Sequence, residues 1–329
     1  MTKVMLLVVS VLTMKTLCQT NRGYCLHSGL ELPDMGFMNT SAKCAILKPR
    51  DYILPRIDPG QVGDVTKLNL TSGQSHQRIT VARNPPLFVI PDFLTQDETD
   101  KLISLATANG LIVAMTVGEN GSVTHQKGRQ SHTTFLRHDL DSVLLDIRRR
   151  VSVLTDMPMD ILEESEWYQF GRYGVGDHYH SHYDSSLSTR ETLMNKPCCH
   201  QSYPPHTKTS CVLCRYITVM VYLNDVEEGG ETAFPLADGP DTTPKEEHIN
   251  LSQYCQRSAI LVQPQKGKAV IWYNNIRDPE TGWVGTADPY SLHGGCNVVK
   301  GEKWILNFWV SAPQHNRKFG NSIYTERWV

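Results

Sequence analysis

The spacing of apolar and polar residues changes along the chain. Residues 19–85 show no sustained period and scattered Gly, Pro, Asn and Ser, so we expect a weakly patterned, irregular N-terminal segment. From Leu87 onward, short apolar runs and helical patterns appear, and strand-like segments dominate after Glu164. This pattern predicts a folded domain that begins near Leu87.

Two helices are predicted in the first third of this domain. Thr95 and Glu98 match a capping box, and Gly110 follows the expected helix end near Asn109. The inward positions of this helix would be Leu102, Ile103 and Leu105. The second helix is marked by apolar residues at helical spacing, namely Leu140, Val143, Leu144, Ile147, Val151 and Leu154. The run Arg148–Arg150 lies between them, and we expect it to form a solvated helix face.

Short segments rich in Val, Ile, Tyr or Trp follow, with glycine turns between several of them. They are 166–173, 177–184, 215–223, 258–263, 267–273, 289–293 and 303–310. Many short strands in one block favour a sandwich or a jelly-roll barrel. Residues 185–214 interrupt the series with prolines, four cysteines and two histidines, and we expect a Cys-rich inserted loop there.

Charge and the first residues restrict the partners and the compartment. The formal net charge is −2, and this argues against a general nucleic-acid binder. Lys3 precedes the apolar run Val4–Leu12, and the small residues Thr16 and Cys18 stand third from last and last before a possible cut after Cys18, so residues 1–18 are predicted to be a signal peptide. A membrane anchor is the alternative, but Lys15 interrupts the run well before the roughly 20 apolar residues that a span needs. We therefore expect no membrane attachment after cleavage.

The cysteines and sequons agree with an oxidising compartment. Cleavage after Cys18 would leave eight cysteines, which suits disulfide pairing, and Cys255 and Cys296 are plausible long-range partners. Zinc in the 198–214 insertion is the alternative for the clustered cysteines. Asn-x-Ser/Thr sequons occur at Asn39, Asn69, Asn120 and Asn250. We expect a glycoprotein of the endoplasmic reticulum lumen or a secreted one.

The segment from His178 to Asp184 contains candidate metal ligands. Alternate side chains of a strand share a face, so His178, His180, His182 and Asp184 are expected to point the same way. A His and a carboxylate two residues apart, joined by a second His, form the facial triad of non-haem iron oxygenases. His293 is the best candidate for the third ligand, because the two glycines after it would allow close backbone approach. The alternative is a solvent-exposed strand face.

Lys303 stands at the head of an apolar strand. If it is buried, its ammonium needs an anion, and a carboxylate-bearing cosubstrate would supply one. The alternative is a surface lysine whose stem covers apolar residues.

Four segments, in this order, resemble the prolyl 4-hydroxylase family of Fe(II)- and 2-oxoglutarate-dependent dioxygenases. They are 173–184, 215–235, 266–273 and 293–309. The resemblance covers about residues 86–311, which implies a dioxygenase domain over this range and a C-terminal tail over 312–329. Within the family, Tyr290–Cys296 and Gly282–Gly285 are most similar to the transmembrane branch. No EF-hand loop of that branch occurs here, and a signal peptide stands in place of its anchor, so calcium control and membrane attachment are not carried over.

The resemblance implies a mainly β fold with flanking helices and a double-stranded β-helix (jelly-roll) core. It also implies hydroxylation of peptidyl proline at the 4-position in a protein or peptide, with Fe(II), 2-oxoglutarate, O2 and L-ascorbate. There are two alternatives: a hydroxylase that acts on another residue such as lysine, and a non-catalytic jelly-roll binding protein.

Site residues follow from the same resemblance. The catalytic iron ligands would be His182, Asp184 and His293. The cosubstrate carboxylate would be held by Lys303, Tyr173 and Thr218. The peptide substrate would lie near Tyr179, Arg215 and Trp309. Strand alternation, however, puts Tyr179 on the face opposite His182 unless the chain bends between them.

Overall fold

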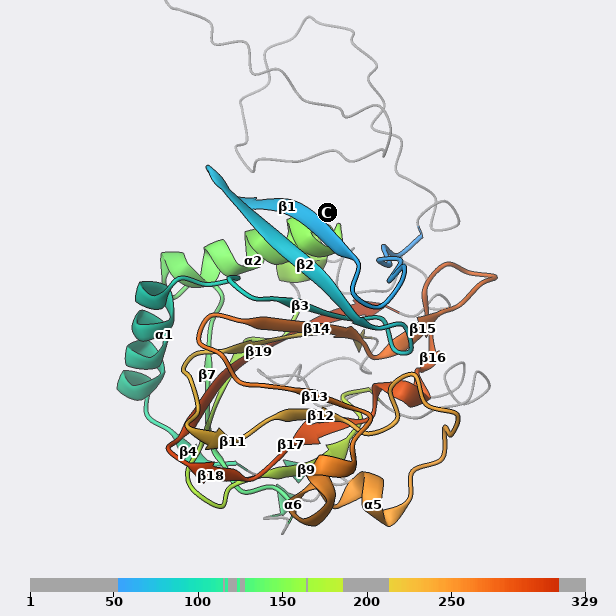
Figure 1. Ribbon diagram of the computed structural model, residues 1–329. Coiled ribbons are helices and arrows are strands. Elements are labelled where there is room, and N and C mark those ends of the chain that lie inside the picture. Colours follow the sequence, from blue (N-terminus) through green and yellow to red (C-terminus); the bar gives the residue numbers. More distant parts are fainter. Residues whose placement is uncertain are drawn as a thin grey trace, which may run out of the picture. The chain divides into compact units, whose positions relative to one another are not determined.

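Two facing β-sheets form the core of the structure, a computed structural model that describes residues 53–114, 116–117, 123–124, 128–163, 165–185 and 213–313 (Figure 1). The large sheet contains, in spatial order, β1 (Val65–Thr71), β2 (Gln74–Ala82), β3 (Leu87–Ile90), β14 (Ala269–Tyr273), β10 (Leu213–Tyr222), β19 (Lys303–Pro313), β8 (Tyr168–Tyr173), β7 (His132–Leu136) and β4 (Ile112–Val113). The small sheet contains β13 (Ile260–Val262), β12 (Thr232–Phe234), β17 (His293–Gly295) and β9 (Tyr179–His182). Three two-stranded ribbons complete the strands: β5 (Thr116–Val117) with β6 (Val123–Thr124), β11 (Glu228–Gly229) with β18 (Val298–Lys300), and β15 (Asn275–Arg277) with β16 (Val284–Ala287).

The chain passes back and forth between the two sheets. It runs from β8 in the large sheet to β9 in the small one, and returns through β10. The strands β12 and β13 then pair in the small sheet, β14 lies in the large sheet, β17 in the small sheet and β19 in the large sheet. The strands pair antiparallel throughout this core. This alternation is the double-stranded β-helix, so the expected jelly-roll core is confirmed.

The hairpin of β1 and β2 differs from expectation, because it lies inside the segment expected to be irregular. It extends the large sheet beyond β3. In β1 only Leu70 is fully buried, and most of the other side chains are exposed. A strand at a sheet edge that buries so little carries no apolar alternation, so its sequence did not indicate it.

The expected strand over 289–293 also differs: residues Pro289–Ser291 form a 3₁₀ turn, η2, and β17 begins only at His293.

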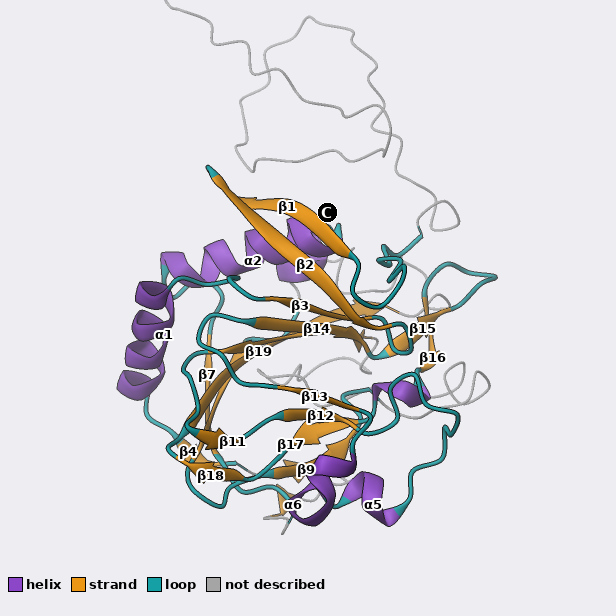
Figure 2. Ribbon diagram, viewed as in Figure 1, coloured by secondary structure: helices purple, strands orange, loops and turns teal. Residues whose placement is uncertain are grey.

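The two predicted helices are present. In α1 (Gln96–Asn109) Thr95 and Glu98 form the capping box, and Gly110 ends the helix. Leu102 is buried as expected, whereas Ile103 and Leu105 are only half-buried. Helix α2 (Ser142–Thr155) begins after its N-cap Asp141, so Leu140 lies outside the helix and is 54% exposed. The short α3 (Met159–Glu163) follows, and Figure 2 shows α1 and α2 along one flank of the large sheet.

The arginine run of α2 is not the solvated face that its sequence indicated. Arg149 is exposed, but Arg150 is buried and its side chain is only 8% exposed. The Arg150 guanidinium forms a salt bridge with Glu98, the capping-box glutamate of α1, and donates to the carbonyl of Phe93 at 2.7 Å. Pairing with a carboxylate from another helix is what makes burial of this charge tolerable.

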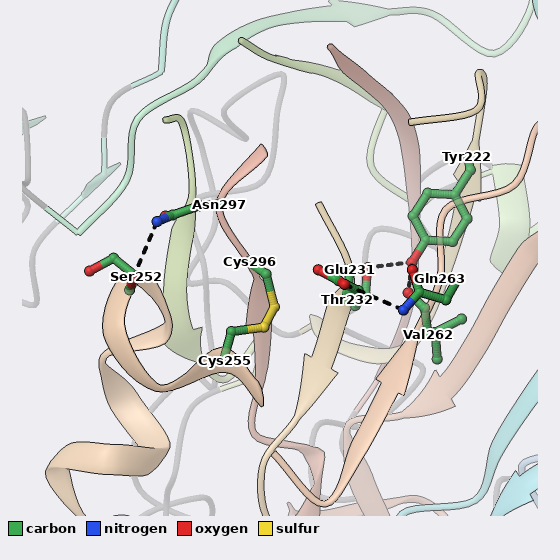
Figure 3. The surroundings of a disulfide bond; sticks show 9 residues. All are labelled: Tyr222, Glu231, Thr232, Ser252, Cys255, Val262, Gln263, Cys296 and Asn297. Carbon is green, nitrogen blue, oxygen red and sulfur yellow. Dashed lines mark hydrogen bonds between the residues drawn. A yellow bond between two sulfur atoms is a disulfide. The ribbon is translucent and has the colours of Figure 1, made fainter. Parts of the chain in front are cut away.

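A helical segment and a disulfide lie beside the small sheet (Figure 3). The segment contains α5 (Glu246–Ile249), α6 (Leu251–Tyr254) and the 3₁₀ turn η1 (Cys255–Arg257). A disulfide joins Cys255 to Cys296, directly after β17, and confirms the pairing that the sequence made plausible. The cysteines at 198, 199 and 211, and with them the zinc alternative, lie outside the described residues. Among the residues described, no helix has the length and apolar character needed to cross a membrane.

Candidate functional site

Two neighbouring strands of the small sheet bring the candidate metal ligands together. In the pairing of β9 with β17, His182 lies directly opposite His293. The two glycines after His293 permit this approach, because a Cβ on Gly294 would lie 2.5 Å from the carbonyl oxygen of Tyr179. The close backbone approach expected from these glycines is therefore observed.

Asp184 completes a compact group of three side chains. The Nε2 atom of His182 lies 3.7 Å from Oδ1 of Asp184, and the Nε2 atom of His293 lies 3.5 Å from its Oδ2. The ligand atoms of all three residues lie within 4.8 Å of one another. Asp184 and His293 are buried, and His182 is partly exposed toward a cavity. Two imidazoles and one carboxylate in this arrangement match the facial triad, which leaves further coordination positions of an iron ion open.

Each imidazole is oriented by a backbone carbonyl. The Nδ1 atom of His182 lies 3.0 Å from the carbonyl oxygen of His180, and the Nδ1 atom of His293 lies 2.8 Å from that of Ser291. A carbonyl only accepts, so Nδ1 carries the proton in both rings and Nε2 keeps its lone pair. Both lone pairs are therefore available for a metal on the side where Asp184 lies.

Hydrogen bonds hold the carboxylate of Asp184 from behind. Its Oδ2 atom accepts from the hydroxyl of Thr218 at 2.7 Å and from the indole Nε1 of Trp309 at 2.9 Å. The amide of Asn274 donates to Thr218 at 2.7 Å, and the indole of Trp272 donates to Asn274 at 2.8 Å. This buried chain of donors fixes the orientation of Asp184, as outer-shell partners do at metal sites.

The protonation states suit metal binding. Burial and the neighbouring His293 lower the pKa of His182 to about 3, so its imidazole is neutral at pH 7. Burial alone would raise the pKa of Asp184, but the neighbouring histidines and the hydrogen bond from Thr218 outweigh it and hold this pKa below its usual range. Neutral imidazoles and an ionised carboxylate are the forms that bind a metal.

Tyr179 lies on the same side as His182, because β9 contains a bulge. Tyr179 and His182 are three positions apart along β9, but their partners Gly295 and His293 are only two positions apart along β17. The extra residue reverses the alternation, and the ring of Tyr179 stacks on that of His182 with centroids 3.8 Å apart.

The same bulge removes two histidines from the site. The rings of His178 and His180 face each other with centroids 4.6 Å apart, and neither lines the cavity. The expectation that His178, His180, His182 and Asp184 share one face is wrong for this reason.

A cavity of ≈ 380 Å³ connects the three candidate ligands to Lys303. Lys303 is 3% exposed, which excludes the alternative of a surface lysine. Its Nζ atom lies 5.6 Å from the ring centroid of Tyr173 and 5.4 Å from that of Tyr222, and none of the described residues forms a salt bridge with it. Burial lowers the pKa of Lys303 to about 7, with Glu231 opposing the shift. A cation in such a place is available for an anionic ligand that enters the cavity.

Known proteins resemble this chain in the same region. A family model described as the 2OG-Fe(II) oxygenase superfamily matches residues 168–311. The chain is 42% identical over 194 residues to the transmembrane prolyl 4-hydroxylase of Mus musculus, an alignment that covers 56% of this chain and 37% of that protein. It is 31% identical over 239 residues to probable prolyl 4-hydroxylase 4 of Arabidopsis thaliana, which covers 72% of this chain and 71% of that protein. This chain belongs to the prolyl 4-hydroxylase family.

The chain spans 37% of the length of the mouse relative. Among solved structures, the viral collagen prolyl hydroxylase vCPH from Paramecium Bursaria Chlorella virus-1, in a 2OG complex, is 25% identical. The comparison covers 70% of this chain and 99% of that one, with a TM-score of 0.47.

Prolyl 4-hydroxylases are 2OG-Fe(II) oxygenases, and the residues present fit Fe(II) and 2-oxoglutarate. The donor set of two imidazoles and one carboxylate suits Fe(II). Lys303 is a buried cation in the same cavity, where one end of a dicarboxylate can meet it while the other end meets the metal. Tyr173, the other expected cosubstrate residue that lines the cavity, is buried, and burial raises the pKa of its phenol.

Of the expected substrate and cosubstrate residues on β10 and β19, Arg215 and Trp309 line the cavity, and only Thr218 is placed differently from what the resemblance implied. The hydroxyl of Thr218 is bonded to Asp184, and Thr218 does not line the cavity. The indole nitrogen of Trp309, a residue expected near the substrate, is also bonded to Asp184. Arg215 stacks over Trp309 at 3.6 Å from its centroid and donates twice to Glu166, at 2.6 and 2.8 Å.

Two charged residues at the site were missed in the sequence. Glu166 is 4% exposed and pairs with Arg215, and it stands just before the apolar strand β8. That signal, a charge at the head of an apolar strand, is the one that indicated Lys303. Arg129 lines the cavity and lies over the ring of Tyr179 at 4.8 Å, but its surrounding sequence has no apolar period that would have indicated it.

Proposed function

We propose that this protein hydroxylates peptidyl proline at the 4-position within the secretory pathway. The observation that carries the proposal is one cavity that holds the triad His182, Asp184 and His293 together with the buried cation Lys303. When bound, Fe(II) and 2-oxoglutarate use O2 to convert a C–H bond into C–OH, with succinate and CO2 as coproducts. Membership of the prolyl 4-hydroxylase family favours proline as the residue that is oxidised.

The chain's own residues have separable tasks in this reaction. His182, Asp184 and His293 hold the metal, and Lys303 binds the distal carboxylate of 2-oxoglutarate. Tyr179, whose flat ring stacks on His182, offers an aromatic wall against which a prolyl ring can pack.

Another part of the cavity wall is held by paired groups. The Glu166–Arg215 salt bridge and the hydrogen bond from the indole of Trp309 to Asp184 leave these side chains little freedom to rearrange. These residues, together with Arg129, would set the position of the peptide backbone near the metal.

Turnover with defined peptides tests the activity. The full chain, supplied with Fe(II), 2-oxoglutarate and ascorbate, should produce succinate and add one oxygen atom to proline in proline-rich peptides. His182→Ala should abolish both products while the variant keeps the thermal unfolding midpoint of the wild-type apoprotein. Oxygen mapped to lysine instead would favour the alternative hydroxylase, and a folded, iron-loaded protein that makes no succinate with any peptide would favour a non-catalytic binding protein.

The compartment is a separate part of the proposal. We place the protein in the lumen of the endoplasmic reticulum or outside the cell, with residues 1–18 removed and ascorbate keeping the iron reduced. Asn69 in β1 is exposed and suits a glycan, whereas Asn250 is half-buried beside α6; Asn39 and Asn120 lie outside the described residues. Expression in secreting cells should give a protein that begins at Gln19 and loses mass on treatment with an N-glycosidase. An intact N-terminus without glycans would refute this localisation and leave the activity untouched.

A further inference from the structure

A short turn between β16 and β17 is built around Asp288. The turn is η2, Pro289–Ser291, and Asp288 is its N-cap. The Oδ1 atom of Asp288 accepts from the backbone N–H of Tyr290 at 3.1 Å. The carbonyl of Asp288 accepts twice from Ser291, from its N–H at 3.0 Å and from its hydroxyl at 2.7 Å. Asp288 and Ser291 are 6% and 1% exposed, so the hydrogen bonds between them are buried, whereas Pro289 and Tyr290 are partly exposed.

This turn contacts both elements that carry candidate metal ligands. The carbonyl of Ser291 is the group that accepts from Nδ1 of His293 at 2.8 Å. The carbonyl of Pro289 accepts from the hydroxyl of Tyr183 at 3.1 Å, and Tyr183 immediately precedes Asp184. The shape of one turn therefore sets the orientation of an imidazole on β17 and contacts the residue next to the carboxylate.

The turn is anchored to the rest of the domain on its far side. The N–H of Asp288 donates to the carbonyl of Asn274 at 2.8 Å, and Asn274 belongs to the donor chain that reaches Asp184 through Thr218. Arg56 approaches Oδ2 of Asp288 at 3.8 Å and donates to the carbonyl of Asn275 at 2.7 Å. The Asp288 carboxylate therefore caps the turn through Oδ1 and faces Arg56 through Oδ2.

We propose that Asp288 is a positioning residue for His293. Its side-chain cap holds the Pro289–Ser291 turn in the shape that keeps the Ser291 carbonyl on Nδ1 of His293 and directs Nε2 toward Asp184. Without the cap, the Ser291 carbonyl moves, and the imidazole loses the partner that fixes its tautomer and its ring orientation. The inference rests on the proposed function, because it presupposes that His293 binds a metal.

Metal affinity distinguishes this role from ordinary structural support. A cap that only stabilises the fold lowers the thermal unfolding midpoint and leaves the affinity of the folded protein for metal unchanged. A cap that positions His293 changes the affinity itself. Loss of an outer-shell partner typically weakens metal binding by about 10–100-fold, and we expect Asp288→Ala to fall in this range.

The experiment is a titration of the full-length apoprotein with Co(II) alone, followed by its visible absorption. Asp288→Ala should raise the Co(II) Kd at least about tenfold and alter the absorption bands. Asp288→Asn is the matched control: an asparagine caps about as well as an aspartate, so its Kd should stay within about threefold of the wild type. Thermal unfolding of each apoprotein verifies that it is folded, and Asp288→Gly replaces the alanine variant if that one does not fold, because glycine is tolerated at N-caps.

The outcomes separate the two proposals. Wild-type binding that is lost in His182→Ala, together with an unchanged Kd in Asp288→Ala or Asp288→Gly, would overturn the role of Asp288 alone. Equal losses in the asparagine and alanine variants would also overturn the cap, because charge and not capping would then decide the affinity. A wild-type protein that binds no Co(II) would overturn both the metal site and the role of Asp288.

Discussion

Lys303 makes the binding of 2-oxoglutarate sensitive to pH. The ammonium is 3% exposed, and the described part of the chain offers it aromatic rings but no salt bridge. Burial lowers the pKa of Lys303 to about 7 in the protein without cosubstrate. The distal carboxylate of 2-oxoglutarate is attracted strongly by the charged ammonium of Lys303 and only weakly by the neutral amine. Affinity is therefore full well below pH 7 and is lost as the pH rises through the pKa of Lys303.

The size of the effect follows from the protonated fraction. With a pKa of about 7, roughly half of the Lys303 side chains are charged at pH 7 and about one in eleven at pH 8. An apparent Kd is the intrinsic Kd divided by the competent fraction, so 2-oxoglutarate should bind about twofold more weakly at pH 7 and about elevenfold more weakly at pH 8 than at low pH. Above pH 8 the loss is about tenfold for each pH unit. The carboxylates of the ligand are ionised throughout, since carboxyl groups titrate near pH 4.

Calorimetric titration of the Mn(II)-loaded protein with 2-oxoglutarate between pH 6 and pH 9 measures this dependence without turnover. Lys303→Arg is the control, because a guanidinium stays charged over this range. The arginine variant should show a flat profile, whatever its absolute affinity. An equal slope in both proteins, or a flat profile in the wild type, would refute the assignment of the titration to Lys303.

Three further predictions concern stability. Thr218→Val removes the hydroxyl that donates to Asp184 and should lower the free energy of unfolding, measured in urea, by about 1–3 kcal/mol. Thr218→Ser keeps the hydroxyl and should preserve the stability, and an unchanged unfolding midpoint in the valine variant would contradict a stabilising hydrogen bond. Cys296→Ser opens a disulfide with a sequence separation of 41 residues, and loop entropy predicts a loss of about 4 kcal/mol, seen as a lower melting temperature in the absence of reductant. Equal melting temperatures of the variant and the wild type would argue against this. Arg150→Met leaves Glu98, the capping-box glutamate of α1, without its buried partner and should lower the free energy of unfolding in urea by about 3 kcal/mol. The exposed Arg149→Ala should lower it by less than about 0.5 kcal/mol, and similar losses in both variants would show that burial does not separate the two arginines.

Local signals in the sequence were sufficient for much of the fold. The capping box at Thr95 and Glu98 marked the start of α1, because its hydrogen bonds join residues only three apart. Apolar runs marked the jelly-roll strands for a similar reason: strands buried between two sheets carry their signal in a few consecutive residues. The His-x-Asp spacing, the glycines after His293 and the lysine at the head of β19 pointed to the candidate site through residue type and spacing alone.

The sequence did not indicate features that depend on a distant partner. β1 and β2 bury few side chains, and their backbone hydrogen bonds to each other and to β3 hold them in the sheet. Arg150 is buried only because α2 meets Glu98 of another helix. The donors from Thr218 and Trp309 reach Asp184 from two strands that follow it by 34 and 125 residues.

The bulge in β9 separates what the sequence indicated from what only strand pairing decided. The sequence by itself determined the residue types of the triad and the lysine, since metal and carboxylate chemistry requires them. Simple alternation, however, placed Tyr179 away from His182, and only the pairing of β9 with β17 decided otherwise. A bulge inserts its extra residue where two strands must fit each other's hydrogen bonds, and that fit is a property of the pair of strands and not of either strand alone.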